Sequence, residues 1–216
     1  MRTHLYIIQI FILLFCLAQV SFTQVTSNKL IEAISEGKTD EVKKILENGA
    51  DANELTDIGA TPLIHATWGK NINIVKLLVE NGADINLNTE RFGCALNVAA
   101  SVGAMEIAEY LIENEADLNC QDKEGKTPLM SAIYDSQPDL AKMLIDAGAD
   151  VNIKGDLDWT ALMFAAMRGD VESVKNLIDA KANVNSKTKD GETPLQRATA
   201  LEYKEIITIL KKAGAE

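Results

Sequence analysis

The chain has 216 residues, in which 32 acidic side chains outnumber 21 basic ones and give a formal net charge of −11 at pH 7. A surface that binds nucleic acid needs clustered lysines and arginines to displace the counterions of the phosphates, whereas the basic residues here are scattered among acidic ones. The composition therefore argues against nucleic acid as a partner. The negative charge indicates solubility, and its alternative meaning is attraction to a basic protein.

The N-terminal residues have the layout of a secretory signal peptide. An apolar run, Leu5–Leu17, follows Arg2, and the small residues Cys16 and Ala18 stand at positions −3 and −1 of a cut after Ala18. We therefore predict a signal peptide over residues 1–18, export to the periplasm or secretion, and no membrane association after cleavage. The alternative is a retained membrane anchor, although the run is shorter than the roughly 20 apolar residues that a span needs.

A unit of 33 residues repeats through the rest of the chain. Its most regular mark is an alanine near the end of each unit, at Ala50, Ala83, Ala116, Ala149, Ala182 and Ala215. A fixed period of this length predicts one supersecondary unit stacked on copies of itself, because a single unit cannot bury its apolar face alone.

Each unit predicts two helices and a projecting turn. Thr61 before Pro62 can cap the start of a short first helix, which we place from about Pro62 to Trp68. A break follows, and then a longer second helix with apolar residues at helical spacing, as in Ile74–Val79. Glycine after the second helix, as at Gly82, suits the left-handed conformation that ends it.

Two units depart from this pattern. The third unit opens with Cys94 in place of the threonine and ends its second helix at Glu115 in place of glycine. The fifth has Ala161 in place of proline and Lys181 in place of glycine. We expect looser helix ends in both.

The unit resembles the ankyrin repeat, which has a 33-residue period and a Thr-Pro-Leu-His-x-Ala opening. The resemblance rests on Thr-Pro-Leu at residues 61–63, 127–129 and 193–195, on variants of it at 94–96 and 160–162, and on endings such as Asn48–Asn53. It implies an all-α ankyrin-repeat solenoid of six helix-turn-helix units with projecting β-turn or hairpin loops. After a linker over residues 19–26, the predicted units are 27–58 as an N-terminal cap, 59–91, 92–124, 125–157, 158–190, and 191–216 as a C-terminal cap.

The sequence offers no constellation for catalysis. Beyond the predicted signal peptide it has one histidine, His65, which stands at the histidine position of the ankyrin motif, and the resemblance implies a structural residue that hydrogen-bonds within and between neighbouring turns. No pair of histidines or cysteines has metal-ligand spacing, and no glycine-rich phosphate loop or paired nucleophile and base is present. We therefore expect no enzyme, no cofactor and no metal.

Two cysteines remain after the predicted cleavage, Cys94 and Cys120. In an oxidising compartment they could pair. The repeat places Cys94 at the start of a first helix and Cys120 at the base of the following turn, and we expect these positions to be too far apart for a disulfide. We therefore expect two buried free thiols.

Recognition of a partner protein remains as the function. Repeat proteins bind partners on the concave face that the turns and first helices share, and the resemblance places the chain among them as a monomer. The alternatives are a membrane-tethered scaffold and a regulator or protective factor of a periplasmic or secreted enzyme. Trp159, just before a helix start, is expected to be the most exposed aromatic residue, whereas Trp68, Tyr134 and Met167 either face solvent or pack between repeats. The candidate binding residues on this face are Ile58, Trp68, Arg91, Lys126, Tyr134, Asp135, Leu157, Trp159, Met167 and Arg168.

Overall fold

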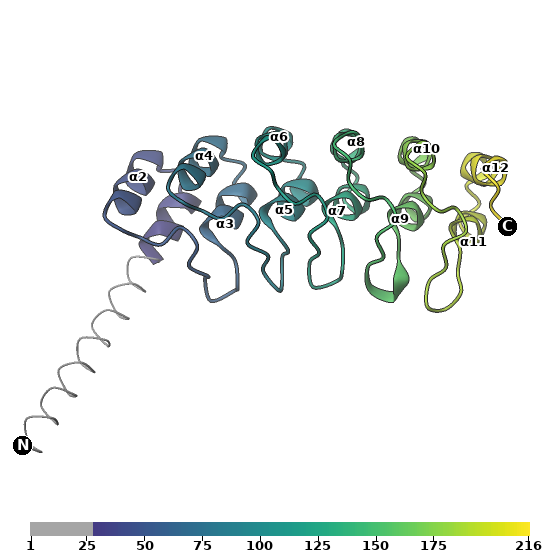
Figure 1. Ribbon diagram of the computed structural model, residues 1–216, viewed down its shortest axis with the longest axis horizontal. Helices are drawn as coiled ribbons and strands as arrows, with labels where there is room; N and C mark the ends of the chain where they lie inside the picture. The colour runs from purple at the N-terminus through teal and green to yellow at the C-terminus, as the bar shows by residue number, and fades with distance from the viewer. Residues whose placement is uncertain (1–27) are drawn as a thin grey trace, which may run out of the picture.

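Two rows of helices form one elongated, curved stack in the computed structural model, which describes residues 28–216 (Figure 1). The predicted signal peptide, and with it the choice between cleavage and a retained anchor, lies outside the described residues. The first helices of the units are a helix over residues 28–35, α3 (Pro62–Trp68), α5 (Ala95–Val102), α7 (Pro128–Tyr134), α9 (Ala161–Arg168) and α11 (Pro194–Ala200). The second helices are α2 (Thr39–Glu47), α4 (Ile72–Glu80), α6 (Met105–Glu113), α8 (Pro138–Asp146), α10 (Val171–Asp179) and α12 (Lys204–Lys212).

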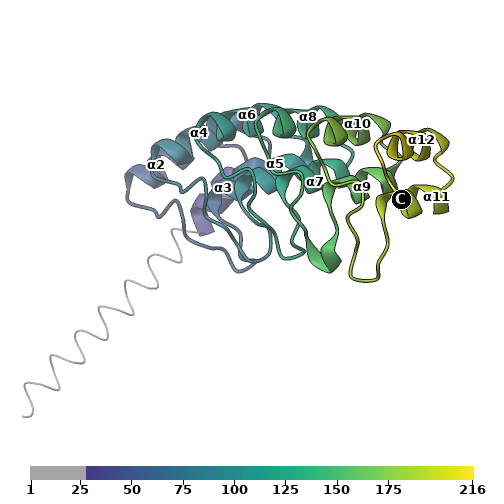
Figure 2. The ribbon, with the colours of Figure 1, turned by 45° about the vertical axis from the view of Figure 1, so that its right-hand side comes forward.

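The second helices form the convex side of the arc, and the first helices and the long loops form the concave side (Figures 1 and 2). We call the loops fingers; they comprise residues 54–60, 87–93, 120–126, 153–159 and 186–192. The predicted all-α repeat architecture is therefore correct. The described residues hold no strand, and their one β-bridge joins Thr89 to Gly93 within a finger.

The first helices begin directly after the threonines that were predicted to cap them. The side chains of Thr61, Thr127, Thr160 and Thr193 each accept a hydrogen bond from the backbone N–H three residues later, as helix caps do. At Cys94 the capping contact comes instead from Asn97, whose Oδ1 accepts the Cys94 N–H at 3.2 Å. The predicted helix from Pro62 to Trp68 matches α3 at both ends.

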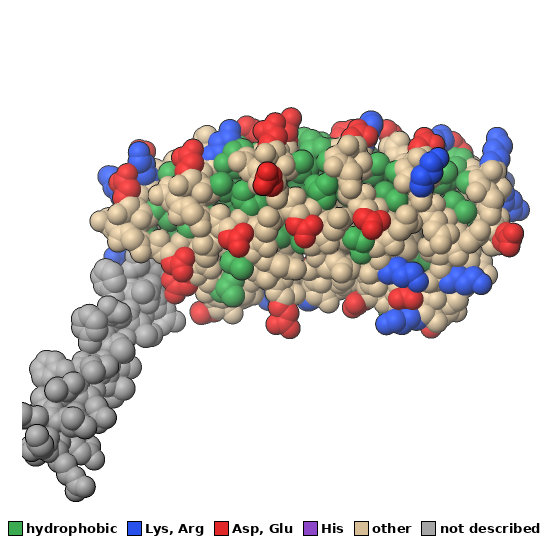
Figure 3. All heavy atoms as spheres, in the orientation of Figure 1, with side chains coloured by type: hydrophobic (Ala, Val, Ile, Leu, Met, Phe, Trp, Pro, Cys, Tyr) green, Lys and Arg blue, Asp and Glu red, His purple; other side chains and the backbone are tan. Residues whose placement is uncertain are grey.

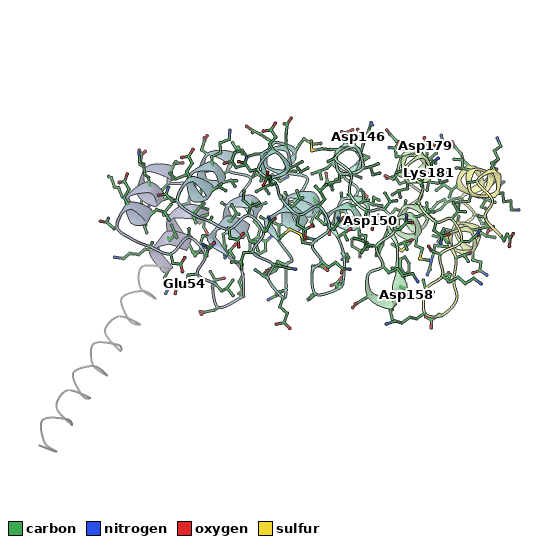
Figure 4. The ribbon with its side chains drawn as sticks, viewed as in Figure 1. Glu54, Asp146, Asp150, Asp158, Asp179 and Lys181 are labelled. Carbon is green, nitrogen blue, oxygen red and sulfur yellow. A yellow bond between two sulfur atoms is a disulfide. The ribbon has the colours of Figure 1, made fainter. Side chains whose placement is uncertain are left out.

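The second helices end at equivalent residues in all units. Gly82 and Gly148 follow two of them in the left-handed conformation, with φ of 87° and 95°. Glu115 and Lys181 adopt the same conformation without being glycine, with φ of 63° and 69°; Figure 4 labels Lys181 at the end of α10. Since α6 and α10 have nine residues like α4 and α8, these two ends are as long as the others but carry backbone strain.

The core repeats with the sequence. Leucines of the first helices, such as Leu96 and Leu129, and of the second helices, such as Leu111 and Leu144, are no more than 1% exposed. The small side chains at Ala66, Ala99, Ala132, Ala165 and Ala198 are buried between neighbouring first helices. Burial of this periodic set between units holds the stack together.

An asparagine ladder joins consecutive units at the polar surface. The side-chain Oδ1 atoms of Asn53, Asn86, Asn119, Asn152 and Asn185 accept a backbone N–H of the next unit at 2.7 to 2.9 Å. Asn53 Nδ2 also donates to the Gly82 carbonyl at 2.9 Å. Each of these side chains therefore fixes the spacing of two units.

The expectation of two free thiols was wrong. Cys94 and Cys120 form a disulfide, and their Cα atoms are 6.2 Å apart. The base of finger 120–126 folds back beside the start of α5, where Asn97 Nδ2 donates to the Lys126 carbonyl at 2.8 Å. This return of the chain brings the two Cα atoms within the distance that a disulfide can bridge. The positions of the two cysteines within the repeat do not reveal it.

Within residues 28–216 every helix is too short or too polar to cross a bilayer.

Candidate protein-binding surface

Most of the large exposed apolar side chains lie in the fingers and at the end of a first helix. In the part of the chain that the structure describes, these side chains are Leu55, Ile58, Tyr134, Leu157 and Leu201, with exposed fractions of 55, 46, 38, 54 and 44%. Three of them lie in fingers, Tyr134 ends α7, and Leu201 directly follows α11. None lies on a second helix. We define the inner surface as the five fingers together with the C-terminal ends of the first helices.

A central pocket of about 130 Å³ opens on this inner surface. Its lining comes from three consecutive units and includes four of the residues that the sequence pointed to, Trp68, Arg91, Lys126 and Asp135. The residues that line it are Trp68, Arg91, Phe92, Asn97, Val98, Ser101, Asp122, Lys126, Ser131 and Asp135.

Most charged groups of the central pocket have partners within the protein. Ser101 donates to Asp135 at 2.5 Å, and Asp122 Oδ1 accepts two backbone N–H groups at 2.9 Å. Lys126 pairs with Glu124 at 2.8 Å. Burial alone would lower the pKa of Lys126, but the hydrogen bond and charge of Glu124 raise it, and the same contact lowers the pKa of Glu124. The ion pair is thus present throughout the neutral range.

Aromatic rings form the N-terminal wall of the pocket. Trp68 is half-buried and meets Phe92 edge-on, with ring centroids 4.8 Å apart, and also meets His65 edge-on at 5.2 Å. The Arg91 guanidinium lies over the Phe92 ring, 5.1 Å from its centroid. Trp68 is therefore partly packed between units, as one of the two sequence interpretations had it.

The expected hydrogen bonding of His65 is not found. Its Nε2 atom is buried and has no hydrogen-bond partner among the described residues, and burial lowers the pKa of its imidazole.

Tyr134, and not Trp159, is the more exposed of the two aromatic candidates. Trp159 is half-buried, because its ring packs 4.9 Å from Phe164 and Arg197 of the next unit covers it at 5.0 Å. Tyr134 is exposed and carries two cations over its ring, Lys126 at 4.4 Å and Arg168 at 5.6 Å. Tyr134 is therefore the more accessible aromatic residue.

The remaining sequence candidates divide between surface and core. Ile58 and Leu157 lie exposed in fingers, and Leu157 belongs to a short 3-10 turn, η1 (Asp156–Asp158), at the finger tip whose Asp158 is labelled in Figure 4. Arg168 is exposed and donates to Ser136 Oγ at 2.7 Å. Met167 is half-buried and packs against the core.

A second hollow, which we call the fingertip groove, adjoins the central pocket and has a volume of about 380 Å³. Leu55 contributes to its apolar part together with Ile58. The sequence reasoning missed Leu55 and Phe92, although an apolar side chain in an otherwise polar finger is itself a signal. The residues that line the groove are Leu55, Asp57, Ile58, Gly59, Thr89, Glu90, Arg91 and Lys123.

On the face drawn in Figure 3, acidic side chains extend along the whole stack, and basic ones lie along its upper edge and at its lower C-terminal end. A larger hollow of about 550 Å³ is bordered only by α2 and the residue before it, so it is the surface of one helix and joins no two units.

In the described residues no group of three or more histidine, cysteine, aspartate or glutamate side chains could hold a metal ion.

Comparison with known proteins gives a consistent result. The family model for ankyrin repeats (three copies) matches residues 4–89, 88–155 and 154–216. The fold is similar to the crystal structure of an ankyrin repeat domain from Acinetobacter baumannii AYE, with a TM-score of 0.79 and 32% sequence identity, over 87% of this chain and 98% of that one. No curated protein sequence matches this chain significantly.

Proposed function

Because the chain belongs to the ankyrin-repeat family, whose members generally mediate binding between proteins, we propose that it binds a partner protein through its inner surface. The observation that carries the proposal is the one-sided exposure of large apolar side chains. Folding leaves Leu55, Ile58, Tyr134 and Leu157 accessible on the inner surface and leaves no side chain of this kind exposed on the second helices. Aromatic, apolar and arginine side chains of this kind form the centres of protein interfaces.

We further propose that binding takes place in an exported compartment. Two independent features support export: the signal-peptide layout of residues 1–18 and the Cys94–Cys120 disulfide, since disulfides persist chiefly in oxidising compartments. A retained N-terminal anchor would instead make the protein a tethered scaffold. N-terminal sequencing of the exported protein separates the two: cleavage predicts a chain that begins near Gln19, and a product that still carries Leu5–Leu17 would rule cleavage out.

Binding through the inner surface is tested by capturing the partner from the exported fraction and measuring its affinity for paired variants. The inner variant combines Tyr134→Ala with Leu157→Ala, because both side chains are exposed and their truncation should leave the core intact. It should weaken binding at least about thirtyfold, as truncation of aromatic and apolar anchors often does.

The matched outer variant combines Glu109→Lys on α6 with Lys142→Glu on α8, so that the net charge is conserved. It should bind like the unmodified protein. Loss of binding in the outer variant, with the inner variant unaffected and both folded, would place the interface on the convex side.

A further inference from the structure

Arg91 occupies the junction of the two hollows of the inner surface, since it lines both the central pocket and the fingertip groove. Its finger is held closed by reciprocal backbone hydrogen bonds between Thr89 and Gly93, at 2.9 and 3.0 Å. Gly93 has φ of 70°, and a Cβ atom there would come within 2.4 Å of Asn97 Oδ1. The backbone that presents Arg91 is therefore fixed before a partner arrives.

Arg91 is also the charged residue of the central pocket whose side chain has no intramolecular hydrogen bond or ion pair among residues 28–216. The other charged groups are Asp135, bound by Ser101, Asp122, bound by backbone amides, and Lys126, paired with Glu124. The Arg91 side chain instead lies on the Phe92 ring, which orients the guanidinium without using its N–H donors. A guanidinium held in this way presents a fork of donors that matches a carboxylate.

We propose that Arg91 binds the carboxylate of a single aspartate or glutamate side chain in an extended segment of the partner, and that an adjacent apolar residue of this segment packs on Leu55 and Ile58. This inference rests on the proposed function and adds the chemistry of the segment that is recognised. Hollows that share Arg91 leave room for the segment to continue past it in both directions, so the carboxylate belongs to an internal side chain. A C-terminal carboxylate is the competing source.

Local charge is compatible with one acidic residue and not with an acidic run. Three fingers border the two hollows. Fingers 87–93 and 120–126 are neutral in sum, whereas finger 54–60 adds the two carboxylates of Glu54 and Asp57. Asp57 and Glu90 line the fingertip groove, however, and would repel further carboxylates. The charged residues of fingers 87–93 and 120–126 are Glu90, Arg91, Asp122, Lys123, Glu124 and Lys126.

The test is selection of a random library of linear dodecapeptides, displayed on phage, against the purified full chain. Selected clones should share one acidic residue next to an apolar one. The corresponding synthetic peptides should lose about tenfold or more in affinity for Arg91→Ala, as expected when a hydrogen bond to a charged group is removed. Arg91→Lys should show a smaller loss, because it retains the charge but not the bidentate geometry. Lys211→Ala, which removes one positive charge from the outer helix α12, is the matched control and should bind normally.

Several outcomes would overturn the inference. The inference fails if the library yields no binders or if the selected binders lack the acidic residue. It also fails if the binders lose as much affinity for Lys211→Ala as for Arg91→Ala. If binding requires a free C-terminus of the peptide and is lost on amidation, Arg91 binds a C-terminal carboxylate and not that of a side chain. If peptides ignore Arg91 but lose affinity with Tyr134→Ala and Leu157→Ala, the Arg91 inference fails while the inner surface stands. Thermal unfolding of each variant confirms that it is folded.

Discussion

Exposure of individual side chains is the property that the sequence conveyed least well. The repeat placed Tyr134 and Trp159 on the inner side, but which of them faces solvent depends on the side chains that pack around each ring. Trp159 packs against Phe164 and under Arg197, 38 residues later, and is half-buried, whereas Tyr134 stays 38% exposed although Lys126 and Arg168 lie over its ring. A repeat specifies positions, and only packing between units specifies exposure.

Core leucines should dominate stability. Leu96→Ala or Leu129→Ala removes a side chain that is at most 1% exposed and should lower the free energy of unfolding by about 2–5 kcal/mol in urea titrations. Leu157→Ala is the control, because its side chain is exposed and the change should stay within about 0.5 kcal/mol. Losses below about 1 kcal/mol at Leu96 and Leu129 would mean that these side chains are not in the core.

His65 should make stability depend on pH. Burial lowers its pKa below the ordinary value of 6.5, so the unfolded chain takes up a proton at a pH where the folded protein does not. The free energy of unfolding should therefore fall as the pH drops through about 6.5. This decrease should be smaller in His65→Gln, measured by denaturant titration between about pH 7.5 and 5.5. Parallel pH profiles of the two proteins would show that the imidazole is not desolvated.

At the scale of the element, local sequence was a reliable guide. Thr-Pro predicted the start of α3, and the 33-residue period predicted the leucines and alanines that are buried. The structure corrected what depends on chains that meet in space. Finger 120–126 returns to α5 and brings Cys120 to Cys94, and no spacing rule could reveal this return. The looser helix ends expected at Glu115 and Lys181 are instead strained ends of normal length.

The strain at these ends predicts a stabilising substitution. Lys181→Gly replaces a residue at φ of 69° by the one that adopts this conformation freely, and it should raise the free energy of unfolding by up to about 1 kcal/mol. Gly148→Ala, at φ of 95° in the unit before, should have the opposite effect. Thermal unfolding measures both, and a destabilised Lys181→Gly protein would mean that the lysine side chain contributes more than its backbone costs.

At the scale of the whole molecule, the disulfide connects stability to compartment. It closes a loop with a sequence separation of 26 residues, which should contribute about 3 kcal/mol. The oxidised protein should therefore unfold at a higher denaturant concentration than Cys94→Ala/Cys120→Ala, and a reducing agent should shift only the former. Equal unfolding midpoints with and without the reducing agent would indicate free thiols and would remove one of the two supports for export.

Curvature gives the six helix pairs two unequal surfaces, and the inner one combines fixed fingers with accessible apolar side chains (Figure 2). The central claim is that a partner covers this side. Its most direct test is hydrogen–deuterium exchange of the captured complex compared with the free protein. The account predicts slower exchange in fingers 54–60, 87–93, 120–126 and 153–159, and unchanged exchange in α4, α6 and α8. Protection confined to those second helices, with the fingers exchanging as in the free protein, would contradict it.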